Sequence, residues 1–295
     1  MERDIWRIVV AALKRLPPTC KPKQLYTTAE VLAVLLWAAL YDRSILWACR
    51  RRSWPVQAWR RRLPDQSTMS RRLRDPALLE HLTRVLDIIQ RAFDDGDNSL
   101  LRIDGKPLSV SVFSDDRDAT MGWGAGIYAR GYKLHAIVAN ARRIVAFIVE
   151  PMGVAECTTG EKLIEQAAKR VHLKPDTLVL GDPSYDTNAL HKVAREHGTQ
   201  LLAGRRRPGT ALSKGHAQDP GRVVSTQLLE GDEEVARWQR NERAAIEHFF
   251  GGLSSASGLY ALPPWTRTLG RVRVWVYAKV ALNAARIART QARAA

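Results

Sequence analysis

Two aspartates each end a short apolar run that has the composition of a buried strand. Asp104 follows residues 100–103, Asp182 follows residues 178–181, and a glycine stands beside each of them. The carboxyl ends of neighbouring parallel strands meet at one edge of an open sheet, where ligand sites form. If these strands are neighbours, the two carboxylates converge, and a divalent cation that prefers oxygen ligands, such as Mg²⁺ or Mn²⁺, would relieve their repulsion.

Glu247 is the third acidic residue of this candidate site. It lies in a predicted helix over residues 233–253, where Ile246, Phe249 and Phe250 can face a sheet and hold the carboxylate over it. Three carboxylates can bind two metal ions roughly 3.5–4 Å apart, an arrangement that promotes in-line displacement at a phosphodiester. The alternative is that each carboxylate only caps a helix or closes a turn.

The elements that would position these residues change in type along the chain. Residues 1–95 have helical spacing of apolar side chains, for example over 5–16 and 28–40. Strands are predicted at 99–104, 108–113, 132–139, 144–149, 177–182 and 200–203, helices at 161–171, 187–197, 233–253 and 268–293, and a loop at 204–222. This order predicts an α/β fold in which a mixed sheet is flanked by helices and preceded by a small all-α domain.

Two short helical segments in the N-terminal region, residues 55–63 and 67–73, suit a helix-turn-helix. Hydroxyl and guanidinium groups on and after the second segment are candidate contacts to DNA phosphates and bases. These candidates are Ser67, Thr68, Ser70, Arg71, Arg72 and Arg74, and Arg60, Arg61 and Arg62 lie in the first segment. Amphipathic helices with exposed arginines are also common in bundles, so the pattern leaves DNA reading and plain packing both open.

The basic residues are concentrated at the two ends of the chain. Lys and Arg number 46 against 30 Asp and Glu, which gives a formal net charge of +16. Residues 1–95 and 236–295 carry the whole excess, and residues 96–235 are neutral. This distribution favours two surfaces that neutralise phosphates, with solvated arginine-rich helices as the alternative.

The cysteines and the apolar segments indicate the compartment. Three widely spaced cysteines fit neither a disulfide framework nor a zinc site; they are Cys20, Cys49 and Cys157. The longest apolar stretch, residues 31–40, is far shorter than the roughly 20 residues that cross a bilayer, and Glu2 and Asp4 are unlike the start of a signal peptide. We therefore expect a cytoplasmic protein with no membrane span.

Several motifs, taken together and in order, resemble the DDE transposases of bacterial insertion sequences, of the insertion sequence 4 or 5 type. The motifs are Arg-Ile-Asp-Gly at 102–105, Gly-Tyr-Lys-Leu-His at 131–135, Gly-Asp-Pro-Ser-Tyr-Asp at 181–186, Arg243 with Glu247, and the segment 64–74. The resemblance covers roughly residues 60–290. It implies an RNase H-like catalytic domain over residues 96–295, behind a helical DNA-binding domain over residues 1–95.

The resemblance also assigns roles. It implies that Asp104, Asp182 and Glu247 bind two Mg²⁺ or Mn²⁺ ions, and that the protein binds the terminal inverted repeats of its element, cleaves DNA and transfers the strand into target DNA. A homodimer or higher oligomer would hold the DNA, in a bacterial cell and at the nucleoid. Two alternatives remain: a catalytically inactive DNA-binding regulator, and a related metal-dependent resolvase or nuclease.

The sequence departs from the family pattern at three positions. Gly105 stands where Ser or Thr is usual, and Arg240 and Ser254 stand where many members have Tyr and Lys. These positions concern contacts to DNA ends and leave the acidic trio intact. The interval between Asp182 and Glu247 is too short for the large β-rich insertion of some relatives, so we expect a compact catalytic domain.

Neighbouring residues provide further candidates. Arg243 precedes Glu247 by one helical turn, the less favourable order for an ion pair, so we expect Arg243 to contact phosphate, together with Arg240 and Lys133. Asp186 precedes a predicted helix and is expected to be its N-cap.

Histidines and tryptophans near the site have two interpretations. His135 and His248 could assist catalysis, although a histidine on an apolar face is usually structural. Trp123 and Trp238 could stack an unpaired base, although most tryptophans are expected in the core.

Overall fold

The chain folds into two compact units. The computed structural model describes residues 2–17, 24–55, 62–111, 113–124, 126–140, 142–210, 212 and 217–294. The first unit comprises Met1–Asp94, Phe113–Asp118 and Gly252–Ala295, and the second comprises Asp95–Val112 and Ala119–Gly251. The C-terminal segment therefore belongs to the same unit as the N-terminal helices, although it lies at the opposite end of the sequence.

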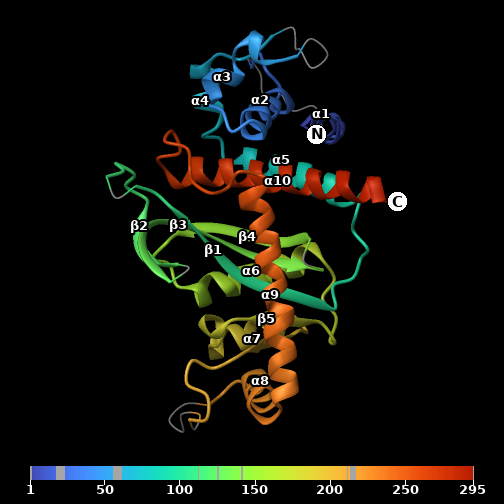
Figure 1. Ribbon diagram of the computed structural model, residues 1–295, viewed down its shortest axis with the longest axis vertical. Coiled ribbons are helices and arrows are strands. Elements are labelled where there is room, and N and C mark those ends of the chain that lie inside the picture. Colours follow the sequence, from blue (N-terminus) through green and yellow to red (C-terminus); the bar gives the residue numbers. More distant parts are fainter. Residues whose placement is uncertain are drawn as a thin grey trace. The chain divides into compact units, whose positions relative to one another are not determined.

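The first unit is helical (Figure 1). Its elements are α1 (Glu2–Lys14), α2 (Thr28–Leu40), α3 (Ile45–Ala48), a 3₁₀ turn (Arg51–Ser53), α4 (Gln66–Arg72), α5 (Ala77–Gln90) and α10 (Leu269–Ala294). Helix α10 packs against α1, α2 and α5. Helix α2 begins with a capping box, in which Thr27 and Glu30 satisfy each other's backbone donors.

Tryptophans form the centre of this unit. The rings of Trp37 and Trp54 stack with centroids 4.6 Å apart, and Trp6 meets both edge-on. On α10, the buried Lys279 donates from Nζ to the carbonyl oxygen of Ala39 at 2.7 Å and forms an ion pair with Asp42. The ammonium group therefore ties α10 to the end of α2.

The second unit is built on a six-stranded mixed sheet with the order β2-β3-β1-β5-β6, in which β4 also pairs with β3. The strands are β1 (Leu100–Ser109), β2 (Thr120–Gly124), β3 (Ile127–Ala139), β4 (Arg143–Pro151), β5 (Leu178–Gly181) and β6 (Gln200–Ala203). Strands β1 to β4 pair antiparallel, whereas β1 with β5 and β5 with β6 are parallel. The predicted fold class, a mixed sheet flanked by helices and preceded by a helical region, is confirmed and fits an RNase H-like DDE domain.

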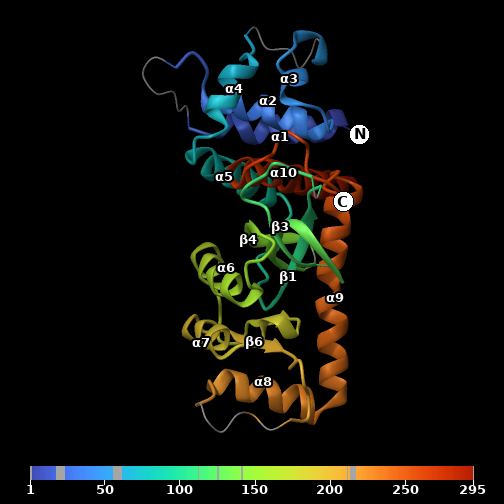
Figure 2. The ribbon, with the colours of Figure 1, turned by 90° about the vertical axis from the view of Figure 1, so that its left-hand side faces the viewer.

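Helices cover both faces of this sheet. They are α6 (Glu156–Arg170), α7 (Asn188–Glu196), α8 (Pro220–Gly231) and α9 (Glu233–Ser255). Figure 2 shows α6 and α7 on one face and α9 running along the other. Buried aliphatic side chains of β1, β3 and β5 pack against α6 and α7 to form the core, for example Ile103, Ile137, Val179, Leu163 and Leu190.

Three details differ from the sequence-based expectation. The two strands predicted at 99–104 and 108–113 form one strand, β1, because β3 pairs with it continuously from Leu101 to Ser109. Strand β2 was not predicted, and α8 begins inside the predicted loop at 204–222.

None of the helices in the described part of the chain is both long enough and apolar enough to span a membrane.

Candidate active site

Asp104 and Asp182 lie at the same level of two neighbouring strands. Asp182 directly follows β5, whereas Asp104 stands within β1, which continues to Ser109, so the strand end predicted at Asp104 is wrong. Strands β1 and β5 are parallel neighbours in which Arg102 pairs with Leu180, so each aspartate follows this pair by two residues on its own chain segment. The two strands are thus neighbours, which is the condition under which the two carboxylates were expected to converge. The fold brings two of the three predicted metal ligands together.

Asp104 carries a carboxyl group whose charge is poorly compensated. Its Oδ1 accepts a hydrogen bond from the backbone N–H of Gly105 at 2.7 Å, and its Oδ2 lies 3.4 Å from Nη1 of Arg243. Burial, and then the negative charges of Asp182 and Glu156, raise the pKa of Asp104 to about 6 against the lowering effects of Gly105 and Arg243. Such a group favours a proton or a cation at this position.

Asp182 is oriented by the turn that follows it. Its Oδ1 accepts a hydrogen bond from the backbone N–H of Ser184 at 2.9 Å and another from the Ser184 hydroxyl, so Asp182 caps the 3₁₀ turn Pro183–Tyr185. The preceding Gly181 is required by packing, because a Cβ there would lie 3.1 Å from Cβ of Tyr185 and 3.2 Å from Cγ2 of Ile103. The carboxylate is thus fixed at the end of β5.

Lys133 and Glu156 form a buried ion pair beside the two aspartates. Lys133 is only 5% exposed, and its Nζ lies 2.6 Å from Oε1 of Glu156 in the first turn of α6. Burial raises the pKa of Glu156, but the hydrogen bond from Lys133, the positive charge of Lys133 and the nearby Ser184 hydroxyl outweigh it and leave this pKa below its usual value. The Lys133 charge, expected from the sequence to meet DNA, is used inside the protein.

Glu156 was missed by the sequence analysis. The helix was predicted to begin at residue 161, which left Glu156 in a loop, whereas α6 begins at Glu156. The available signal was an acidic residue in a first helical turn, where it complements the helix dipole.

Gly105 and His135 pair directly across β1 and β3. A Cβ at residue 105 would lie 2.8 Å from Cδ of Lys133 and 3.3 Å from Nδ1 of His135, so the space that a Ser or Thr side chain would need is occupied. His135 is fully buried, its ring nitrogens have no hydrogen-bond partner among the described residues, and burial is the main cause that lowers its pKa to about 4. His135 is therefore neutral near pH 7.

Helix α9 is attached to the strand ends by two side chains that the sequence analysis did not single out. Gln239 donates from Nε2 to the carbonyl oxygens of Gly181 at 2.9 Å and Leu202 at 3.1 Å. Arg102 on β1 donates to the backbone carbonyl of Glu242 at 2.6 Å and also pairs with the Glu242 carboxylate. These contacts determine where Arg243 meets Asp104.

Glu247 lies one helical turn after Arg243 on α9 and is exposed. Residues four apart share a helix face, so Glu247 follows the arginine that contacts Asp104. No group of three or more His, Cys, Asp or Glu in the described ranges is arranged to hold one metal ion. The third predicted ligand therefore stands on the adjoining helix, apart from the carboxylate pair.

Two cavities open beside Asp182. One, of about 280 Å³, is lined by Asp182, Arg240 and Arg243 among others. The other, of about 500 Å³, is lined by Ser184 and several arginines. Both include Pro183 and Arg205, so they adjoin at the turn after β5. The predicted phosphate contacts Arg240 and Arg243 thus share a cavity with a predicted metal ligand.

The DNA-binding candidates of the N-terminal region lie on and after α4. Asp65 caps this helix and accepts hydrogen bonds from the Thr68 backbone N–H at 2.7 Å and the Ser67 hydroxyl at 2.9 Å. Arg72 donates to the carbonyl oxygen of Tyr26 at 2.8 Å, which is a contact within the unit.

The remaining candidates of this region are Ser70, Arg71 and Arg74. Ser70 accepts a hydrogen bond from Arg271 at 3.3 Å, and Arg71 and Arg74 are exposed. Residues 56–61 of the first predicted helix, with Arg60 and Arg61, lie outside the described residues.

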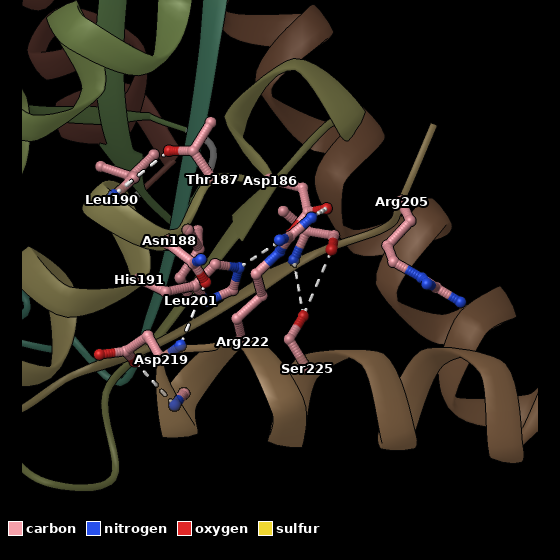
Figure 3. A network of polar contacts seen from close by, with 12 residues as sticks. Asp186, Thr187, Asn188, Leu190, His191, Leu201, Arg205, Asp219, Arg222 and Ser225 are labelled. Carbon is pink, nitrogen blue, oxygen red and sulfur yellow. Dashed lines mark hydrogen bonds and ion pairs between the residues drawn. The ribbon is translucent and has the colours of Figure 1, made fainter. Parts of the chain in front are cut away.

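Asp186 is not the N-cap of α7, so that prediction is wrong. Thr187 caps the helix by accepting from the backbone N–H of Leu190, and Asp186 instead accepts from Nε and Nη2 of Arg222 at 2.8 and 2.7 Å. His191 contacts the same carboxylate at 3.2 Å (Figure 3). The chain therefore uses Asp186 to join α7 to α8.

The remaining aromatic and imidazole candidates differ in exposure. Trp123 is 66% exposed and contacts Tyr128, Trp238 is 39% exposed, and His248 on α9 is also exposed. None of these three has a structural contact in the described part of the chain that links it to the two aspartates.

Comparison with known families agrees with this geometry. The family of the transposase DDE domain matches residues 95–259, which is more than half of the chain and includes Asp104, Asp182 and Glu247. No curated protein and no solved structure matched. Domains of this family act on DNA in transposition and generally use divalent metals. The chain therefore belongs to the transposases that carry a DDE domain.

Proposed function

We propose that this transposase binds the terminal inverted repeats of an insertion sequence, of the 4 or 5 type, and catalyses metal-dependent cleavage and strand transfer. The observation that carries the proposal is the convergence of Asp104 and Asp182 on neighbouring parallel strands, with Arg243 at 3.4 Å from one of them. The family match supports this reaction class, and the aspartate pair supports our placement of the site in the fold.

The donor set fits a divalent cation. Two carboxylates lie close enough for the charge of one to raise the pKa of the other, and their oxygens are the ligands that Mg²⁺ and Mn²⁺ prefer. We propose Asp104, Asp182 and Glu247 as the ligands of two ions, with α9 delivering Glu247. The bound ions would supply an activated water and stabilise the leaving oxygen of the phosphodiester.

The protein's own groups have supporting tasks in this proposal. Gly105 holds Oδ1 of Asp104 and Ser184 holds Oδ1 of Asp182, so each Oδ2 would face a metal ion, and the long contact of Arg243 with Oδ2 of Asp104 at 3.4 Å would give way to it. Arg243 and Arg240 face the cavity beside Asp182 and would bind the phosphates that flank the cleaved bond. No covalent intermediate between protein and DNA is needed.

Recognition of the element ends is assigned to residues 1–95. The exposed Arg71 and Arg74, with Ser67, Thr68 and Ser70, would contact the duplex, while Lys133 and Arg72 serve inside the protein and support the site indirectly. Because both element ends must be held together, we propose a homodimer or larger assembly on DNA. Because the substrate is DNA, we propose that this activity takes place in the bacterial cytoplasm, at the nucleoid.

The test is cleavage of a labelled duplex that carries the repeats flanking the gene. We expect nicking at the repeat in Mg²⁺ or Mn²⁺, none in EDTA, and none for Asp104→Ala, which should still bind the duplex. Nicking of branched DNA in preference to the repeat would indicate a resolvase.

A second function is favoured by the exposed position of Glu247 apart from the aspartate pair. It is a DNA-binding regulator that has the DDE fold and does not cut. Binding to the repeats without cleavage in either metal, and without binding of Mn²⁺ in calorimetry, would support this function against the first.

A further inference from the structure

The cavity of about 500 Å³ next to Asp182 has a strongly basic lining. Four arginines line it, with Asp186 as the single acidic lining residue. The arginines are Arg205, Arg206, Arg207 and Arg222, and the polar lining includes Ser184, Thr187 and Thr210. Its volume is in the range of ligand sites, roughly 300–1,000 Å³.

Two of these arginines are neutralised and fixed within the protein. Arg222 makes a bidentate pair with Asp186, and Arg205 makes a bidentate pair with Glu230. Arg205 also donates to the carbonyl oxygen of Thr210 at 2.6 Å, which holds the loop closed on itself. These pairs build rigid walls and add no net charge.

The other two arginines keep their charge. The side chains of Arg206 and Arg207 are exposed and pair with no acidic group among the described residues. Asp186 cannot neutralise them, because both of its oxygens already accept hydrogen bonds from Arg222 and His191. Two positive charges are therefore left over at a concave surface, which is the arrangement that binds phosphate.

The cavity adjoins the candidate active site. It shares Pro183 and Arg205 with the cavity that contains Asp182, Arg240 and Arg243. Ser184, which orients Asp182, lines it as well. A strand whose scissile phosphate lies at Asp182 would therefore continue past Pro183 into the basic cavity.

The geometry points to a binding site for consecutive backbone phosphates of DNA at Arg206 and Arg207, in the cavity walled by Arg205 and Arg222, for the strand that leads to the cleaved bond. This inference rests on the proposed function for the position of the scissile phosphate, but not for the affinity of the cavity for DNA. A polyanionic strand fits better than a free nucleotide, because the cavity adjoins a second space lined by Arg205, Arg240 and Arg243.

The first test measures binding without cleavage. Fluorescence anisotropy with a 20-base-pair duplex in EDTA gives the affinity from 50 to 300 mM salt for the full chain and for the double variant Arg206→Ala/Arg207→Ala. We expect the slope of log affinity against log salt to become shallower by roughly 2, at about 0.9 per lost phosphate contact. The matched control, Arg142→Ala/Lys169→Ala, removes two exposed charges of the same unit that line neither cavity and should leave the slope nearly unchanged.

The second test uses Cys157, which lines the cavity and is partly exposed. With Cys20→Ser and Cys49→Ser as background, saturating duplex should slow maleimide labelling of Cys157 several-fold, and the Arg206/Arg207 double variant should lose this protection. Equal slopes for the cavity and control variants, or protection by a nucleoside triphosphate but not by duplex, would overturn the inference. If the cavity variants behave as expected while the unaltered chain never cleaves DNA, the phosphate site stands and the transposase proposal fails.

Discussion

Two carboxyl groups near the end of β5 have opposite surroundings. Asp186 is almost fully buried, and although burial raises its pKa, hydrogen bonds from His191 and Arg222 bring the pKa below its usual value. Asp104 has one arginine at 3.4 Å, two acidic neighbours and a pKa raised to about 6. The two residues differ in whether the protein matches the charge of the carboxylate. We propose that this separates an acid that holds the fold, Asp186, from one that serves the chemistry, Asp104.

The largest effect should come from removing a poorly compensated carboxylate. We expect Asp104→Ala to lower cleavage of the element end on the order of 10²–10³-fold or more, because a group that positions charge at the reacting phosphate is lost. Gel assays of cleavage and of end binding would be run in parallel. Glu247→Ala should match Asp104→Ala if Glu247 completes the metal site, and cleavage that survives either change removes that residue from the site.

Removing the matched carboxylate should damage the fold instead. Asp186→Asn leaves Arg222 without its charge partner in a largely buried place, which should cost about 3 kcal/mol of unfolding free energy. Because the pKa of Asp186 is lowered on folding, this contribution is present above about pH 4 and is lost as the pH falls further. Urea unfolding at pH 7 and at pH 3 would measure it, and equal stability of variant and wild type at pH 7 would contradict the comparison.

Asp104→Asn should change the free energy of unfolding in the opposite direction: it should stabilise the protein in the same urea experiment. The pKa of Asp104 rises from 3.8 to about 6 on folding, so its ionisation opposes the native state: stability is highest below pH 4 and falls as the pH rises to about 6. In EDTA at pH 8, the variant should be about 2 kcal/mol more stable than wild type, less than the full shift implies because the side chain is 20% exposed. The gain should vanish near pH 4, and a destabilised variant at pH 8 would show that Asp104 supports the fold.

The smallest effect concerns Gly105, which stands where the family usually has Ser or Thr. Gly105→Ala should cost about 1 kcal/mol, because its Cβ would displace the Lys133 side chain, whose end is held by Glu156. Gly204→Ala is the control, since Gly204 lies outside the helices and nothing lies within 4 Å of its Cβ. Thermal unfolding measures the unfolding midpoint of both variants, and we expect a lower midpoint for Gly105→Ala only. Equal midpoints would mean that the Lys133 side chain moves aside at no cost.

Much of the fold could be predicted from local patterns. The apolar runs before Asp104 and Asp182 identified β1 and β5, and their glycines signalled close packing. The break predicted between 104 and 108 was wrong because Pro107 is tolerated where β1 pairs with β3 alone: β5 pairs only with Leu100 to Arg102. Strand β2 was missed because two of its five residues are glycines, which weaken the strand signal.

The polar contacts of the site could not be predicted in the same way. The pairs Lys133 with Glu156 and Arg102 with Glu242 join residues far apart in sequence, so no local spacing reveals them. For Asp186 the error is of another kind: a local role was predicted, but the actual partner is distant in sequence. Its position before a helix suggested a cap, but Thr187 at the next position met that need and left Asp186 to Arg222. The sequence thus identifies polar residues that can form ion pairs and hydrogen bonds, whereas the partner of each one depends on the tertiary fold.

The amide of Gln239 contacts Gly181, the last residue of β5, and Leu202, the next-to-last residue of β6. These two contacts fix the rotation of α9 about its own axis. A helix turns by about 100° per residue, so deleting a single residue between Gln239 and Arg243 would swing the guanidinium, and Glu247 with it, away from the strand ends. We therefore expect the interval between Gln239 and Arg243 to tolerate substitutions better than a change in its length.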